Sequence, residues 1–270
     1  MTRSWWISGA SARRCAGSSI CSPRRSRACR RPPCLTTRRS IPLHCSRRQA
    51  RLLQTERFPN RDRVGWGLYR LFRFRPQVEF PGKHKLIAAF DAAVRLGDED
   101  AVTHALRHAL VSLFADRELV LPRSLLQPIA DHYARRELYL SPDLGYSVIA
   151  MTWGPGQGTP IHDHDGAWCV EGVWRGRLAI TEYVPCERDG QRWRFAGKGT
   201  SEAHPGTTAS LLPPHEYHTV RNPDPDDIAV SLHVYQRQLR RSHAFLPERD
   251  DGDDGGWMRC EERRLATDGD

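Results

Sequence analysis

Two histidines separated by a single residue, His162 and His164, are the residues of this chain best suited to chemistry. They belong to the segment Pro160-Ile-His-Asp-His, and residues i and i+2 of an extended chain point to the same face. Two imidazoles on one face can meet at one point and bind a transition-metal ion such as iron, zinc or copper. An isolated pair of this kind is weak evidence, so its surroundings decide the interpretation.

Glycines and further histidines surround the pair at regular spacing. Gly156 lies six residues before the first histidine, and Gly176 lies twelve residues after the second. The segment 213–218, Pro-Pro-His-Glu-Tyr-His, then carries His215 and His218, either of which could supply a third ligand. The surroundings therefore favour a metal site over two unrelated surface histidines.

These spacings resemble the two signature motifs of the cupin superfamily, whose fold is a double-stranded β-helix barrel. In the usual first motif a metal-binding Glu follows the histidine pair, and in this chain that position is Cys169. A cysteine there resembles the thiol dioxygenases, specifically the cysteine dioxygenase family. The resemblance extends to the Ser-Leu-His-Val-Tyr segment 231–235 and the Tyr-Ala-Arg segment 133–135, and it covers roughly residues 85–247.

The resemblance implies an Fe(II) site made of His162, His164 and His218. We prefer His218 to His215 because His218 matches the histidine of the second motif, whereas His215 stands where cupins usually have Gly. Three neutral imidazoles leave Fe(II) its full charge, which suits a substrate that brings an anionic thiolate. The implied reaction is the oxidation of L-cysteine by O2 to cysteine sulfinate, with both oxygen atoms transferred to sulfur.

Four more residues are expected at this site. Ser231, His233 and Tyr235 alternate along one extended segment, so they face the same side. The functional interpretation is a relay in which Ser231 fixes the tautomer of His233 and His233 orients the Tyr235 hydroxyl. Cys169 matches the cysteine that forms a thioether with this tyrosine in some family members. The residues before Cys169 differ from those of the crosslinked type, so the crosslink is left open.

Arg135 matches the arginine that binds the substrate carboxylate, since a planar guanidinium pairs with a carboxylate through two hydrogen bonds. Arg136 is the alternative, and the spacing from Tyr133 favours Arg135. Related enzymes that prefer 3-mercaptopropionate carry Gln here, so Arg points to cysteine. Two alternatives remain: a dioxygenase for another small thiol such as 3-mercaptopropionate, or a metal-binding cupin without turnover. The oriented phenol of Tyr235 favours an enzyme.

Charge is distributed unevenly along the chain. The net charge is +9, but residues 1–75 contain 19 Arg and two acidic residues, and the remainder contains 22 basic and 30 acidic residues. The body of the protein is therefore acidic, and we expect no nucleic-acid partner for it. Residues 1–80, rich in Arg, Cys and Ser, look unlike a domain. We expect a disordered segment that arises from an upstream start site, with a basic arm or a targeting segment as alternatives.

Cysteine usage indicates the compartment. Five of the eight cysteines lie in the first 45 residues, and Cys169, Cys186 and Cys260 are too scattered for a disulfide framework. A reducing cytoplasm fits best. No stretch approaches the roughly 18 apolar residues of a membrane span, and we expect a monomer whose partners are the small thiol and O2.

Hydrophobic patterning predicts a mainly β fold with a small N-terminal helical region. Helical spacing recurs over 85–140, in three segments that begin near Lys85, after Asp98 and after Pro122. Short β-rich runs separated by turns fill 145–240 and predict the barrel. The expected organisation is one cupin domain over 81–247 and a disordered acidic tail over 248–270.

Overall fold

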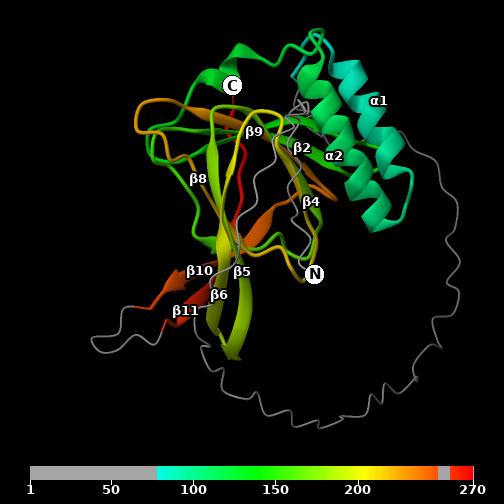
Figure 1. Ribbon diagram of the computed structural model, residues 1–270. Coiled ribbons are helices and arrows are strands. Elements are labelled where there is room, and N and C mark those ends of the chain that lie inside the picture. The colour runs from blue at the N-terminus through cyan, green and yellow to red at the C-terminus, as the bar shows by residue number, and fades with distance from the viewer. Residues whose placement is uncertain (1–77, 249–255, 270) are drawn as a thin grey trace, which may run out of the picture. The chain divides into compact units, whose positions relative to one another are not determined.

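The computed structural model describes residues 78–248 and 256–269. Over these residues the chain is mainly β (Figure 1). The strands are β1 (Ala134–Leu140), β2 (Ser147–Trp153), β3 (Ile161–His162), β4 (Cys169–Arg175), β5 (Leu178–Asp189), β6 (Arg192–Ala203), β7 (Thr208–Leu211), β8 (His218–Arg221), β9 (Ala229–Tyr235), β10 (Arg241–Pro247) and β11 (Met258–Arg264). The helical elements are α1 (Lys83–Val94), α2 (Glu99–Ala115) and the short 3-10 turn η1 (Arg123–Leu126).

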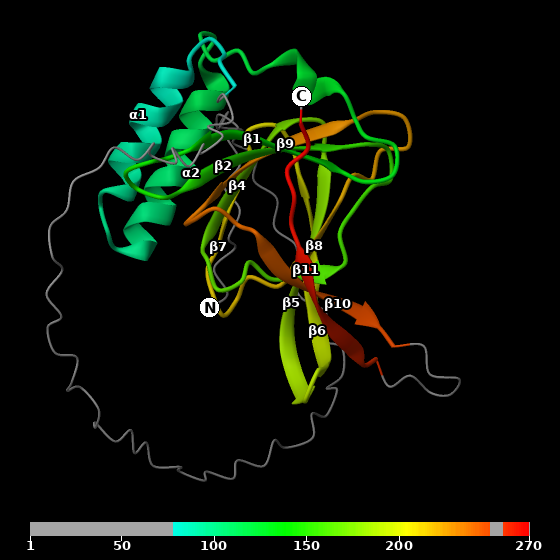
Figure 2. The same ribbon diagram turned by 180° about the vertical axis from the view of Figure 1, so that it is seen from behind.

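The strands form two antiparallel sheets. In the first sheet the order is β1-β2-β9-β4-β7. In the second, β10, β11, β6, β5, β8 and β3 follow one another and close into a ring, because β3 pairs with both β8 and β10. The mainly β architecture, with two helices that precede the strands along the chain, is the one that the sequence predicted (Figure 2).

Strands β2, β4 and β9 have two different faces. Even-numbered residues such as Val148 and Leu232 pack in a core cluster that includes α1 and α2. Odd-numbered residues such as Ile149 and Tyr235 pack in a second cluster, shared with β5 and β8, between the two sheets. Since successive side chains of a strand alternate, an odd-numbered residue of these three strands points toward the second sheet. This parity decides which polar side chains can reach the site.

The two helices form where the apolar spacing predicted them. On α1, Leu86 and Phe90 are buried, and α2 packs against β4 and β7. Asp98 caps α2, since its carboxylate accepts a hydrogen bond from the Ala101 N–H at 3.0 Å. These helices cover the even-numbered face of the first sheet and leave the opposite face to the second sheet.

The helical region expected over 85–140 is wrong in its last third. After Pro122 only the four-residue turn η1 is helical, and residues 134–140 form β1. β1 pairs with β2 along its length, so backbone hydrogen bonds of the sheet hold residues 134–140 as a strand. The two arginines of this segment therefore lie on a strand.

The tail expected to be disordered from residue 248 contains a strand. β11 pairs with the whole of β10 and extends to β6, so it closes the second sheet. Its sequence, MRCEERR, lacks the β-branched residues that mark a strand. The backbone hydrogen bonds with β10 stabilise this segment as a strand although its local propensity does not favour one. Residues 1–77, where the N-terminal segment was interpreted, lie outside the described residues.

Among the residues that the structure describes, no helix has the length and apolar character needed to cross a membrane.

Candidate metal centre

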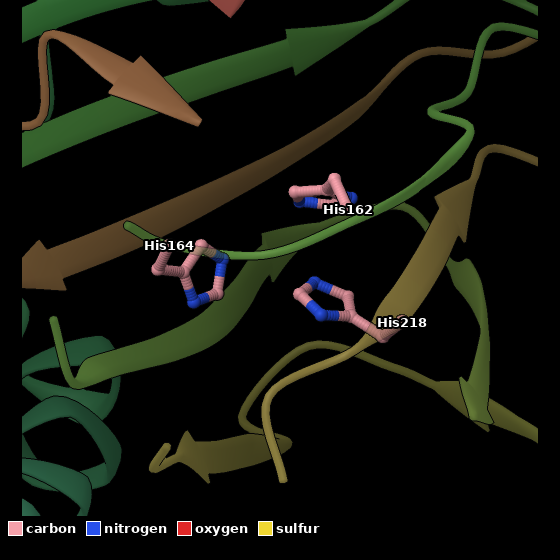
Figure 3. A group of neighbouring side chains, drawn as sticks. All are labelled: His162, His164 and His218. Atoms are coloured by element: carbon pink, nitrogen blue, oxygen red, sulfur yellow. The ribbon is translucent and has the colours of Figure 1, made fainter. Parts of the chain in front are cut away.

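Three histidines converge between the two sheets. His162 ends β3, His164 follows it in the loop before β4, and His218 begins β8 (Figure 3). His162 and His218 are direct partners in the β3–β8 register. One nitrogen of each imidazole lies within 4.8 Å of the others, and the ring centroids of His162 and His218 are 4.4 Å apart. The sequence predicted this meeting, and the register brings it about.

The residue between the paired histidines anchors their segment. Asp163 points away from them and accepts hydrogen bonds from the backbone N–H and the Nδ1 atom of His243, at 2.8 and 2.9 Å. The Asp163 N–H in turn donates to the His243 carbonyl at 3.1 Å. These hydrogen bonds hold the segment 162–164 against β10, and they therefore fix the direction in which the side chains of His162 and His164 point.

Backbone carbonyls orient two of the three rings. Nδ1 of His162 lies 3.2 Å from the Pro160 carbonyl, and Nδ1 of His218 lies 2.7 Å from the Glu216 carbonyl. A carbonyl only accepts, so each Nδ1 carries the proton and each Nε2 keeps a free lone pair. Nδ1 of His164 is buried without a hydrogen-bond partner among the described residues.

Burial keeps the rings of His162 and His164 in the form that binds a metal. Burial, reinforced by the neighbouring His218, lowers the pKa of His162 to about 3. Burial and the same neighbour hold the pKa of His164 well below its ordinary value. At neutral pH both imidazoles are therefore uncharged and present lone pairs to one point. Several acceptors without a donor fit a cation, so this residue set suits a metal ion with histidine ligands.

His215, the alternative third ligand, lies elsewhere. It is exposed and lines a separate small cavity beside β5 and β7. His215 lies in the turn that precedes β8, outside the strand that positions His218.

A cavity of about 30 Å³ adjoins the three histidines. Its wall includes Arg135, His233 and Tyr235 from the first sheet, and Leu265 from the segment after β11. That volume holds about one or two water molecules. Any substrate larger than this needs the wall to move.

The two candidate arginines point in opposite directions. Arg135 pairs with Met151 across β1 and β2, faces the second sheet and lines the cavity. Its Nη1 donates to the Ala266 carbonyl at 3.2 Å. Arg136 faces the other side, where it donates to Thr152 Oγ1 at 3.2 Å and to the Gln127 carbonyl at 2.9 Å. Of the two, only Arg135 reaches the cavity.

Ser231, His233 and Tyr235 lie on one face of β9, as alternation predicts. Ser231 Oγ is 2.8 Å from His233 Nε2, and it accepts a hydrogen bond from Trp153 Nε1 at 2.9 Å. The rings of His233 and Tyr235 stack with centroids 6.0 Å apart, and no hydrogen bond described joins them. The part of the expected relay between Ser231 and His233 is therefore present, and the step from His233 to the Tyr235 hydroxyl is not seen.

Cys169 is the direct partner of Tyr235 across β4 and β9. Both are buried. Burial raises the pKa of the Cys169 thiol well above its ordinary value, although a hydrogen bond with Tyr235 opposes the change. Burial, with Cys169 adding to it, likewise raises the pKa of Tyr235. Both groups are protonated at neutral pH and lie next to each other.

Sequence reasoning missed three contributors. Glu171 faces His233 across β4 and β9, and alternation from Cys169 could have revealed it. Trp153 holds Ser231, and the segment after β11 forms part of the cavity wall. Nothing in the local sequence of the segment after β11 indicates that it lines the cavity.

The comparisons with known proteins agree with this geometry. Residues 129–248 match the family model of cysteine dioxygenase type I. Among curated proteins, the chain is similar to "Cysteine dioxygenase type 1" of Homo sapiens, 25% identical over 101 residues, and to those of Rattus norvegicus and Danio rerio, 26% and 27% identical. Each alignment covers 37% of this chain and 49% of the relative. The chain thus spans about half the length of the curated relatives that it matches.

Solved structures with partial likeness include a protein from Thermus thermophilus, TT1209, which is 19% identical, with a TM-score of 0.34 and coverage of 44% of this chain and 95% of that chain. An oxalate oxidase in complex with the substrate analogue glycolate is 18% identical, with a TM-score of 0.32 and coverage of 44% and 59%.

The matched segment contains the three histidines, Arg135, Cys169 and Tyr235. The expected fold class, a mainly β cupin barrel with a small N-terminal helical region, is confirmed. Through residues 129–248, the chain is similar to the cysteine dioxygenase type I family.

Proposed function

We propose that this protein is an Fe(II)-dependent thiol dioxygenase that oxidises L-cysteine with O2 to cysteine sulfinate. The observation that carries the proposal is the meeting of three imidazoles, a guanidinium and a phenol at one small cavity. In the balanced reaction both atoms of one O2 join the sulfur, the sulfur–hydrogen bond is lost, and the proton leaves as the sulfinate ionises. His162, His164 and His218 would hold the metal.

When bound, Fe(II) supplies the redox chemistry that lets O2 react with a thiol. The side chains of this chain bind and orient the substrate. Arg135 would bind the carboxylate of cysteine through two parallel hydrogen bonds. Its Nη1 now donates to the Ala266 carbonyl. A carboxylate is a stronger acceptor than a neutral carbonyl, so substrate binding would draw the guanidinium from that contact.

Tyr235 would act as a hydrogen-bond donor in the cavity. Its raised pKa keeps the hydroxyl protonated, so the oxygen can donate to an anionic group of the substrate. Cys169, beside it, would either form a thioether with Tyr235 or remain a buried thiol that limits the motion of the ring. In both cases the phenol keeps one position relative to the three histidines.

The small cavity favours a small thiol. A guanidinium and a phenol suit a substrate with one carboxylate and few carbon atoms, and since even cysteine exceeds the 30 Å³ of space, the wall would move to admit it. Cysteine, O2 and the Fe(II) cofactor are accordingly the proposed partners. A monomeric state and a cytoplasmic location stay predictions from the sequence.

The test is turnover by the full chain, purified and loaded anaerobically with Fe(II). We expect O2 consumption matched one to one by cysteine sulfinate, and slower turnover of 3-mercaptopropionate and cysteamine. Arg135→Gln should lower kcat/KM for cysteine by about 10- to 100-fold, which corresponds to losing a charge-assisted hydrogen bond of about 1.5–3 kcal/mol. Arg136→Gln is the matched control and should leave substrate preference unchanged.

Two outcomes would contradict the proposal. Faster turnover of 3-mercaptopropionate by the wild-type protein would replace the substrate but keep the chemistry. Iron binding without consumption of O2 for any of the three thiols would favour a metal-binding cupin that does not turn over.

A further inference from the structure

A buried carboxylate that the proposed chemistry does not use lies directly behind His233. Glu171 is the partner of His233 in the β4–β9 register, and its Oε2 is 3.2 Å from His233 Nδ1. The two residues are 4% and 3% exposed. His233 lines the cavity beside the three metal-site histidines, whereas Glu171 does not. Glu171 therefore adjoins the cavity through its contact with His233.

The burial of Glu171 is unfavourable for the stability of the fold. Neither of its oxygens, nor His233 Nδ1, has a well-directed hydrogen bond among the described residues, although the 3.2 Å separation is short enough for one. Burying a carboxylate without full hydrogen bonding costs stability, and an apolar residue of similar size is often neutral or stabilising in such a place. Its presence therefore calls for a role other than packing.

The contacts of His233 determine where its proton lies. Burial by itself would raise the pKa of Glu171, but the neighbouring His233 more than offsets this, and the pKa ends below its ordinary value. An ionised carboxylate only accepts hydrogen bonds, so His233 Nδ1 must carry a proton to satisfy it.

The other side of the ring leads to the same tautomer. Trp153 Nε1 can only donate, and it donates to Ser231 Oγ at 2.9 Å. The Ser231 hydroxyl hydrogen is then available for His233 Nε2, which lies 2.8 Å away. Hydrogen bonds thus link Trp153, Ser231 and His233, and His233 Nδ1 in turn lies 3.2 Å from the Glu171 carboxylate.

We propose that Glu171 is a positioning residue that holds His233 as the Nδ1–H tautomer and fixes its ring against the cavity. The proposal rests on the proposed function, which it deepens, because the fixed ring of His233 stacks on Tyr235 and so restrains the phenol. The same device is common where a second residue orients a histidine for catalysis.

The decisive measurement is the tautomer itself. Full-length protein with 15N-labelled histidine is loaded with Zn(II), which is diamagnetic, and the ring nitrogens of His233 are assigned by comparison with His233→Gln. In the wild type we expect a protonated Nδ1 and an unprotonated Nε2. In Glu171→Met no strong acceptor remains, and we expect the proton on Nε2, donated to Ser231 Oγ.

Activity and stability provide a second measurement. Glu171→Met should lower kcat for cysteine by roughly 10- to 100-fold with little change in KM or iron content, the size seen when a residue that orients a site histidine is lost. Its melting temperature should stay level or rise. Glu171→Gln, which keeps an oxygen acceptor, should fall between it and the wild type. Glu202→Met, an exposed change on β6, is the control and should alter neither kcat nor the tautomer.

Three results would overturn the proposal. The first is a wild-type His233 that already carries its proton on Nε2. The second is full kcat in Glu171→Met. The third is a second metal ion per chain that disappears in both Glu171→Met and Cys169→Ala, since Cys169, Glu171 and His233 also lie within mutual ligand reach. Because the tautomer is read without iron or thiol, a switch in Glu171→Met would support the positioning role even if no thiol were oxidised.

Discussion

Two clusters of potential metal ligands lie between the sheets, and they differ in how their polar atoms are satisfied. The histidines at 162, 164 and 218 have two Nδ1 protons donated outward to carbonyls, so lone pairs face one another at the centre. The cluster of Cys169, Glu171 and His233 combines an acceptor with a ring that can donate to it. A group of acceptors needs a cation, whereas a complementary group can satisfy itself.

The clusters also differ in the elements that build them. The three histidines come from short strands and a loop next to a cavity. The second cluster comes from two buried, directly paired strands, β4 and β9. A site that exchanges ligands needs open space and is often built on irregular backbone. Residues in a continuous β ladder are held in fixed positions and can fix the position of their neighbours. The comparison therefore supports the proposed metal-binding role of the first cluster and the proposed positioning role of the second.

The largest expected effect separates the clusters by metal content. His218→Ala should remove most of the bound iron and reduce turnover to background, because two imidazoles hold the ion far less firmly than three. His215→Ala changes an exposed histidine and should keep full iron content and turnover. The measurement is iron per chain by elemental analysis after gel filtration. Full occupancy in His218→Ala would move the metal site away from these three residues.

An intermediate effect concerns the stability of the metal-free protein in acid. The folded-state pKa of His162 is about 3, below the ordinary value of 6.5, so between these values the unfolded chain binds more protons. Stability should therefore fall as pH drops from about 6.5 toward 3, by up to about 1.4 kcal/mol per pH unit for each such histidine.

Urea unfolding at several pH values measures this slope. His162→Gln should have a shallower slope over the same window, and His215→Gln should match the wild type. Equal slopes in all three proteins would mean that His162 is not held neutral by its burial.

The smallest effect concerns the cavity wall. Leu265 lines the cavity and is partly buried, so Leu265→Ala should cost about 1–2 kcal/mol, less than the roughly 2–5 kcal/mol of a fully buried leucine. The added space should raise kcat/KM for bulkier thiols relative to cysteine, measured by competition between the substrates. The His233 tautomer should not change, because Leu265 takes no part in the contacts that run from Trp153 to Glu171. A changed tautomer would mean that the two clusters are coupled through the wall.

Much of the candidate site could be predicted because its residues repeat with the period of a strand. The i, i+2 spacing of His162 and His164, and of Ser231, His233 and Tyr235, is a local property that survives folding. Glu171 follows the same alternation, but its role becomes visible only when the register shows that it lies opposite His233 on β9.

The elements that could not be predicted depend on pairing between distant segments. β1 was expected as a helix because its approach carries helical spacing, and β11 was expected as a tail because its composition is polar. In both cases the hydrogen bonds of an adjacent strand decide the structure, and a strand's propensity depends strongly on that context.

The sequence by itself determined the identity and spacing of the three metal-site histidines, the Cys169 substitution and the mainly β class, since all are local patterns. The tertiary structure decided which arginine reaches the cavity, which of His215 and His218 joins the site, and which carboxylate faces His233. Each of these choices depends on strand register: a shift of one residue would exchange Arg135 for Arg136 and turn Glu171 toward the helices. Register is set by the packing of whole sheets, and no short segment contains that information.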